Sequence, residues 1–225
     1  MSDVLTLKLT TGNPDILMSI KNKNGAVAKK VVGVDDLTST LANSYQFSTG
    51  ILPRGTRFFT GTPSKYLVGV ETPSMVKVCV VYDYAKNESE KYNLPLPPCL
   101  FVFRVKDRKV ISTSVHALKR PIFGEMDPLY TFPYGNTNCS SGRVCWGDVK
   151  PQKVESPLAI TMLVSQFLDS TYNGDLFESN TVDFDFLDLP HRGFRSLVKA
   201  LKDVEKFPPE ALSATGKTIL NEMRR

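Results

Sequence analysis

Residues 132–149, FPYGNTNCSSGRVCWGDV, separate a strand-rich first part of the chain from a helix-rich second part. They gather proline, glycine, asparagine and serine around a short apolar step that ends in Cys145. This composition is typical of a constrained loop rather than of a regular element. A thiol between Gly142 and Gly147 can be held at a surface near backbone N–H groups, as a group-transfer nucleophile requires. The other interpretation is a buried core cysteine, because free cysteine is among the most buried residue types.

The bulk composition predicts a globular protein with a real core. The chain has 225 residues, of which 41% are apolar and 23% charged, which fits one large domain or one domain with modest additions. The net charge of +5 comes without a run of Lys and Arg interleaved with aromatic residues, which argues against nucleic acid as the partner. We expect no membrane partner either, because no stretch approaches the ~20 apolar residues of a span.

The four cysteines do not form the spacing of a small disulfide framework, and the N-terminus lacks a signal-peptide pattern. We therefore expect a reduced, cytoplasmic protein. The two histidines, His116 and His191, are far apart, and Cys139 and Cys145 are not a close zinc-binding pair. We expect no metal and no cofactor. His116 is expected at the surface or at the edge of the core rather than as a catalytic base.

The order of expected elements indicates the fold class. Apolar alternation and β-branched runs predict strands over 4–10, 76–84, 100–105 and 110–116, of which the last two form an antiparallel hairpin. A polar loop is expected over 85–93. Helices are expected over 157–172, 192–204 and 210–223. Strands first and helices last indicate an α+β fold, with helices grouped on one side of an antiparallel sheet. We expect a β-rich N-terminal extension over 1–45 and a main domain over 46–225.

The order of strands, extended approach, cysteine and helices resembles that of ubiquitin-conjugating enzymes. In that family a four-strand antiparallel meander precedes a His-Pro-Asn signature, a Gly-x-Ile-Cys step and helices. Asn136 matches the signature Asn, and residues 142–145, GRVC, match the step to the cysteine. Tyr134 and Gly135 stand where the signature His is expected, and Trp146 replaces the usual Leu. The fold implied is an antiparallel β-meander like that of ubiquitin-conjugating enzymes, with flanking helices and the N-terminal extension.

These departures resemble a bacterial branch, the prokaryotic ubiquitin-conjugating-like family D, also known as PRTRC system protein B. The stretches TGILPRGT (49–56) and GRVCWG (142–147) carry this resemblance, which covers about residues 45–175. It implies a plasmid-borne or mobile-element system with three partners: a ubiquitin-like protein, a ThiF-like activating enzyme and a JAB-type peptidase. A catalytically inactive scaffold with the same shape remains an alternative, because the signature His is missing.

The resemblance assigns roles to the loop residues. Cys145 would accept a ubiquitin-like protein as a thioester and pass it to an amine. Asn136 would stabilise the oxyanion or support the loop, unless it only forms a turn. Asp148 would orient the incoming lysine, or else be a surface residue of a Gly-Asp turn. Gly142, Trp146 and Gly147 would shape the loop.

Overall fold

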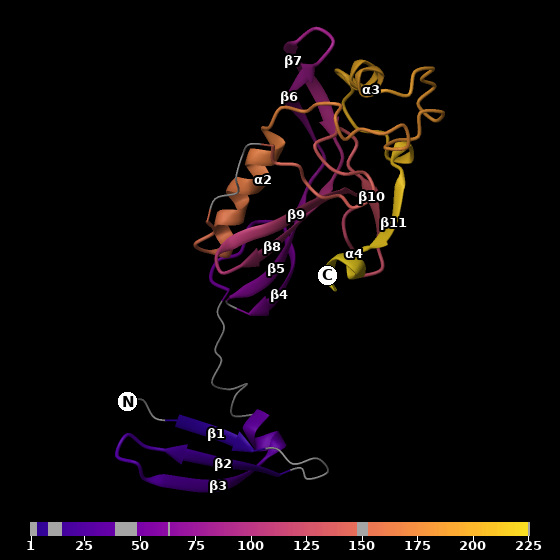
Figure 1. The fold of residues 1–225 in the computed structure, drawn as a ribbon. Coiled ribbons are helices and arrows are strands. Elements are labelled where there is room, and N and C mark those ends of the chain that lie inside the picture. The colour runs from indigo at the N-terminus through magenta and orange to yellow at the C-terminus, as the bar shows by residue number, and fades with distance from the viewer. Residues whose placement is uncertain (1–3, 9–14, 39–48, 63, 148–152, 225) are drawn as a thin grey trace. The chain divides into compact units, whose positions relative to one another are not determined.

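The computed structural model describes residues 4–8, 15–38, 49–62, 64–147 and 153–224 (Figure 1). The chain divides into two compact units, Met1–Ser48 and Thr49–Arg225. The first unit contains an antiparallel sheet in the order β1-β2-β3, and residues 34–38 are helical. Apolar alternation puts Leu7 opposite Met18 and Leu5 opposite Ile20 on one face of this sheet. Its strands are β1 (Val4–Lys8), β2 (Asp15–Lys21) and β3 (Val27–Gly33).

The second unit is built on a six-stranded sheet in the order β11-β10-β9-β8-β5-β4, in which every neighbouring pair is antiparallel. The antiparallel hairpin expected from the strands over 100–105 and 110–116 is confirmed as β8 and β9. The strands of this sheet are β4 (Thr56–Thr62), β5 (Lys65–Thr72), β8 (Cys99–Lys106), β9 (Lys109–Ala117), β10 (Pro128–Thr131) and β11 (Ala214–Thr218).

A two-stranded ribbon is inserted between β5 and β8. It consists of β6 (Met75–Asp83) and β7 (Glu88–Leu96), which pair over their whole length. The expectation of a polar loop over 85–93 is therefore wrong from Glu88 onward. The charged start of β7 forms a strand because β6 supplies its backbone partners while its side chains remain largely in solvent. The apolar end, including Leu94 and Leu96, is buried in the core.

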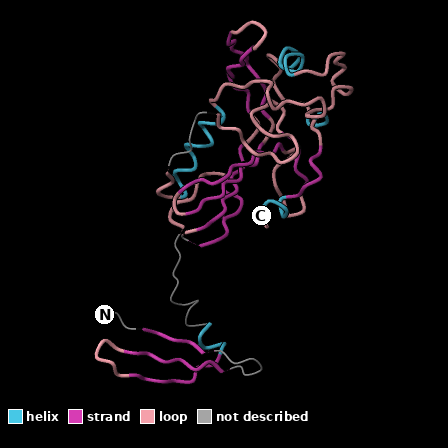
Figure 2. Tube along the Cα trace, in the orientation of Figure 1, coloured by secondary structure: helices cyan, strands magenta, loops and turns pink. Residues whose placement is uncertain are grey.

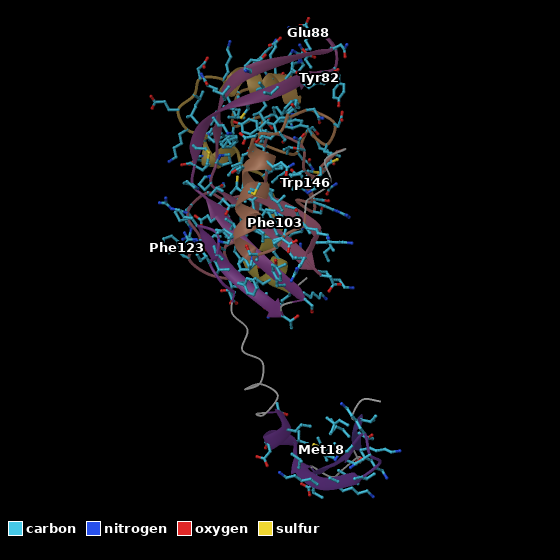
Figure 3. The ribbon with its side chains drawn as sticks, turned by 90° about the vertical axis from the view of Figure 1, so that its left-hand side faces the viewer. Met18, Tyr82, Glu88, Phe103, Phe123 and Trp146 are labelled. Carbon is cyan, nitrogen blue, oxygen red and sulfur yellow. The ribbon has the colours of Figure 1, made fainter. Side chains whose placement is uncertain are left out.

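One face of the six-stranded sheet is apolar and aromatic, and we call it the aromatic face. Phe101 and Phe103 of β8 are fully buried there, and Phe101 lies edge-on to Phe167 at 5.6 Å between ring centroids. Phe167 belongs to α2 (Ile160–Leu168), which follows the 3-10 turn η1 (Pro157–Ala159) and covers this face (Figure 1). Figure 3 shows Phe103 in the interior and Phe123 at the surface. The expected helix over 157–172 is therefore present but ends earlier.

The opposite face carries charged and hydroxyl groups beside a smaller apolar cluster, and we call it the polar face. Leu100 and Val102 pack there with Ile219. The helix expected over 210–223 is present only at its end, as α4 (Ile219–Met223), and is wrong before that, where the segment forms the 3-10 turn η2 (Pro209–Ala211) and then β11. Gly216 has a positive φ of 72°, and β10 supplies the backbone partners for a strand. The amphipathic helix over 192–204 is confirmed as the shorter α3 (Phe194–Leu201).

The chain is thus mainly antiparallel β structure with a few short helices, which is compatible with the α+β class (Figure 2). Within the described ranges, every helix is too short or too polar to cross a membrane. The same ranges hold no cluster of three or more His, Cys, Asp or Glu side chains that could bind a metal ion.

Candidate active site

The loop that ends at Cys145 is a short, tightly bonded hairpin, which we call the cysteine hairpin (residues 136–145). The Cys145 N–H donates to the Asn136 carbonyl at 2.8 Å, and the Asn138 N–H donates to the Arg143 carbonyl at 2.9 Å. At its tip the Asn138 side-chain oxygen accepts from the Ser141 N–H at 2.9 Å. Asn and Ser favour such turns because their side chains bond to the local backbone. These hydrogen bonds close the tip of the hairpin and lead the chain back to Cys145.

The cysteine hairpin is fixed to the sheet through β9. The Val144 N–H donates to the Thr113 carbonyl at 2.9 Å, and the Val115 N–H donates to the Gly142 carbonyl at 2.8 Å. Val144 is buried in the main core, so the apolar step before the cysteine anchors the hairpin. The next residue, Cys145, is exposed. Burial of one residue and exposure of the next follow from the alternation of an extended chain.

Two glycines allow the hairpin to approach its neighbours closely. Gly142 has φ of +72°, and a Cβ added there would lie 2.4 Å from Cε1 of His116. Gly135 has φ of +80°, and a Cβ added there would lie 2.3 Å from the Asn173 carbonyl oxygen. Any other residue would be strained at both positions and would push the hairpin away. The expected loop-shaping role of Gly142 therefore has a geometric basis in the described structure.

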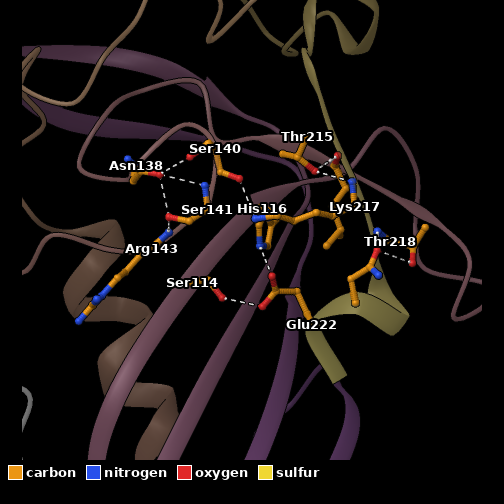
Figure 4. A network of polar contacts seen from close by, with 12 residues as sticks. Ser114, His116, Asn138, Ser140, Ser141, Arg143, Thr215, Lys217, Thr218 and Glu222 are labelled. Carbon is orange, nitrogen blue, oxygen red and sulfur yellow. Dashed lines mark hydrogen bonds and ion pairs between the residues drawn. The ribbon is translucent and has the colours of Figure 1, made fainter. Parts of the chain in front are cut away.

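Behind Gly142, the polar face holds a buried charge network (Figure 4). Glu222 of α4 is 1% exposed and accepts from Arg104 at 2.9 Å and from Ser114 at 3.2 Å. Nε2 of His116 lies 3.4 Å from Oε1 of Glu222. Burial raises the pKa of the Glu222 carboxyl, but the His116 ring and the Arg104 guanidinium outweigh burial and hold this pKa at about 2.

β11 adds a second support, because Nζ of Lys217 donates to the Ser140 carbonyl at 2.7 Å. His116 was expected at the surface or at the edge of the core; it is fully buried, so the surface position is wrong. The C-terminal segment therefore holds the tip of the cysteine hairpin.

The four thiols differ in accessibility. Cys79, Cys99 and Cys139 are buried, whereas Cys145 is exposed. Burial raises the pKa of Cys79 to about 11 and raises the pKa of Cys99 further. The pKa of Cys139 is also raised, first by burial and then by Glu178. A buried thiol with a raised pKa is a poor nucleophile, which leaves Cys145 as the thiol that a substrate can reach.

Cys145 opens into a cavity of about 620 Å³, which we call the thiol cavity. One wall comes from the hairpin and from Trp146 and Gly147, and the other from the end of α2 and the segment that follows it. Trp146 lies edge-on to Phe167, with ring centroids 6.3 Å apart. Gly147 has a positive φ of 57°. The Trp146 ring therefore connects the segment that follows Cys145 to α2, whose end forms the opposite wall of the cavity.

Asn136 lines the thiol cavity, and its side chain bonds to the segment that follows α2. Its amide Nδ2 donates to the Thr171 carbonyl at 2.8 Å and to Ser170 Oγ at 3.2 Å. Its φ of 57° is left-handed, a conformation that Asn tolerates better than most residues. The described contacts therefore join the hairpin to the end of α2. Asp148 lies outside the described residues.

Sequence reasoning missed two acids that line the thiol cavity, Asp169 and Asp175. Asp169 pairs with Lys77 at 2.7 Å, and Asp175 accepts from the Tyr84 hydroxyl at 2.6 Å. Both come from outside the cysteine hairpin, so only the folded chain brings them to the thiol. A polar stretch directly after the α2 helix pattern was the only available signal.

The family comparison agrees with the resemblance drawn from the hairpin motif. The model of prokaryotic E2 family D matches residues 70–215. The chain belongs to this family and is a conjugating-enzyme-like protein. The searches of curated proteins and of solved structures return no match. The match includes the ribbon, the cysteine hairpin and α2.

Proposed function

We propose that this protein is a bacterial ubiquitin-conjugating-like transferase that carries a ubiquitin-like protein as a thioester on Cys145. The observation that carries the proposal is the exposed Cys145 thiol at the mouth of a cavity, on a hairpin fixed from two sides. The strands β4, β5, β8 and β9 are sheet neighbours, as in the meander that the resemblance implies, with the ribbon β6–β7 inserted between β5 and β8.

The reaction requires two acyl transfers. The Cys145 thiolate attacks the terminal carbonyl carbon of the ubiquitin-like protein on the activating enzyme, whose own thiolate leaves. An acceptor ammonium group loses one proton to give a neutral amine, which attacks the carbonyl carbon of the new thioester. The tetrahedral intermediate loses a second N–H proton to solvent as the Cys145 thiolate leaves and the amide forms. Backbone N–H groups at Trp146 and Gly147, which line the cavity, are candidates to stabilise the oxyanion. Asp169 and Asp175 make the cavity favourable for a cationic amine, and Asp148 is proposed to orient it.

The proposed partners follow from the family. A ThiF-like activating enzyme would supply the ubiquitin-like protein, and a JAB-type peptidase would remove it in the same plasmid-borne system. The proposed reaction requires no metal ion and no cofactor on this chain itself.

A second candidate function is a non-catalytic scaffold that binds the same partners. The Asn136 amide favours it, because this group donates to Thr171 and Ser170 instead of pointing at an open oxyanion position. The Tyr134–Gly135 pair in place of the signature His favours it as well.

The test is thioester formation with the cognate activating enzyme, the ubiquitin-like protein and ATP, followed on non-reducing gels. We expect an adduct that a thiol reagent removes, formed by the natural chain and by Cys139→Ala but absent from Cys145→Ala. Cys139→Ala is the matched control because it changes a buried thiol in the same hairpin. Retained partner binding without any adduct on the natural chain would favour the scaffold.

A further inference from the structure

Four lysines lie side by side across one end of the six-stranded sheet, and we call them the lysine row. Lys65 of β5 is directly opposite Lys106 of β8, and Lys106 is directly opposite Lys109 of β9. An isolated bridge then places Lys153 opposite Lys109. All four are exposed. Strands are about 4.8 Å apart, so the row spans about 14 Å across the sheet.

This arrangement is unfavourable for the chain alone. Like charges directly opposite each other on neighbouring strands destabilise a sheet. Within the described part of the chain, no ion pair involves any member of the row. Of the nearby acids, Glu155 pairs with Arg108, and Asp107 lies in the turn of the β8–β9 hairpin. The row therefore produces a positive potential that an external anion can neutralise.

The polar face continues from the lysine row into a pocket of about 350 Å³. Ser112, Ser114 and Ser141 line this pocket, together with Arg104 and Arg143. Figure 4 shows Ser114, Ser141 and Arg143 among them. Its single acid is the buried Glu222, which already accepts from Arg104 and Ser114. Arg143, by contrast, is exposed. The pocket thus adds a cation and hydroxyl groups to the positive charge of the row.

We propose that the lysine row and this pocket dock an acidic segment of a partner protein. Carboxylates of an extended segment would lie over the row, because their charge complements it. Ile111, which is 52% exposed, sits on the bulge between the row and the pocket and offers an apolar contact to a peptide side chain.

A protein segment fits better than nucleic acid. The exposed aromatic rings of the described residues, Tyr84, Phe123 and Phe186, come from other segments, so the row has no ring on which bases could stack. No member of the row lines the thiol cavity. The docking function therefore goes beyond the proposed transfer reaction and can be tested without it.

The test is fluorescence anisotropy at low salt with the full chain and a labelled short peptide of alternating Glu and Ser. We expect Lys106→Glu to weaken binding about tenfold, because it removes one attraction and lets its neighbours pair with the new carboxylate. The same change places a carboxylate between Lys65 and Lys109, so the melting temperature should stay equal or rise. Loss of binding through misfolding is thereby distinguished from loss of the docking site.

The matched control is Lys91→Glu, the same charge change at an exposed position of the ribbon. It should alter the Kd less than twofold. The proposal is overturned if the acidic peptide does not bind, or if the control weakens binding as much as Lys106→Glu does. It is also overturned if a DNA duplex binds more tightly than the peptide and shows the same Lys106 dependence, because the face would then recognise phosphate.

Discussion

The two faces of the six-stranded sheet hold the same hairpin by different physical means. On the aromatic face, Phe101, Phe167 and Trp146 form a chain of ring contacts from the sheet to the thiol loop. On the polar face, Glu222 and His116 lie behind the hairpin tip in a fully buried charge network. Apolar packing tolerates small shifts, whereas a buried ion pair requires its partners at fixed distances. The aromatic face therefore supplies stability, and the polar face sets the position of the tip.

The largest expected effect comes from breaking the aromatic face. Phe167→Ala removes a ring that is 1% exposed and contacts Phe101, Phe132, Tyr172 and Trp146. We expect a loss of about 4 kcal/mol in the free energy of unfolding, measured by urea denaturation. Phe123→Ala is the control, because Phe123 is 78% exposed and its loss should change the same quantity by less than about 0.5 kcal/mol. Similar losses for the two variants would refute the central role of the aromatic face.

The next effect concerns the polar face. Glu222→Gln leaves the partly buried Arg104 without its counter-charge and should cost about 3 kcal/mol at neutral pH. The pKa of Glu222 is lowered to about 2 in the folded state from its ordinary value of 4.5. Its stabilisation is therefore present above pH 4.5 and is lost as the pH falls toward 2.

Urea unfolding midpoints across this acid range compare the stability of the natural chain with that of Glu222→Gln. The natural chain should lose stability steeply, and Glu222→Gln should lose less, because its contribution is already absent. If the urea midpoints of the two chains fall in parallel as the pH is lowered, another carboxyl group dominates the loss of stability in acid.

A smaller effect separates steric contact from backbone strain. Gly142→Ala adds a Cβ that meets the His116 ring at a positive φ, and should cost about 2 kcal/mol. In Gly147→Ala the added Cβ has no neighbouring atom within 4 Å, so only the positive φ is unfavourable, and the free energy of unfolding should fall by about 1 kcal/mol. Thermal melts of both variants measure the difference. Equal costs would mean that the hairpin moves away from His116 without penalty.

The smallest effect on stability is expected at the thiol itself. Cys145→Ala changes an exposed side chain and should alter the free energy of unfolding by less than about 0.5 kcal/mol. It should, however, remove the fast phase of native-state alkylation by iodoacetamide, because the other thiols are buried. Mass spectrometry of the labelled chain gives the site. Fast labelling that persists in Cys145→Ala would reveal a second open thiol.

The sequence predicted those parts of the fold that depend on local pattern. The β8–β9 hairpin and the apolar faces of α2 and α3 follow from alternation and helical periodicity. The start of β7 was missed because its charged residues become a strand only through pairing with β6. The residues 214–218 were assigned to a helix because the apolar spacing of the C-terminal segment is ambiguous, and the choice depends on the distant strand β10.

The same division applies to the site. Composition and glycine spacing indicated Cys145 and the loop-shaping residues Gly142 and Gly147. The buried position of His116 and the acids Asp169 and Asp175 could not be predicted, because contacts between segments far apart in the chain determine them. The roles of Asn136 and Cys145 in transfer remain predictions for the adduct experiment.

The support of the hairpin tip has a consequence for the order in which the protein folds. The hydrogen bond from Lys217 to Ser140 joins residues 77 positions apart, and that from Arg104 to Glu222 joins residues 118 apart. Contacts of such separation form slowly, because long loops must close before any gain is realised. The exposed thiol of Cys145 should therefore reach its final surroundings among the last steps of folding. Until then Cys139 and Cys145 lie on a loosely held loop, where an oxidant could join them before the fold is complete.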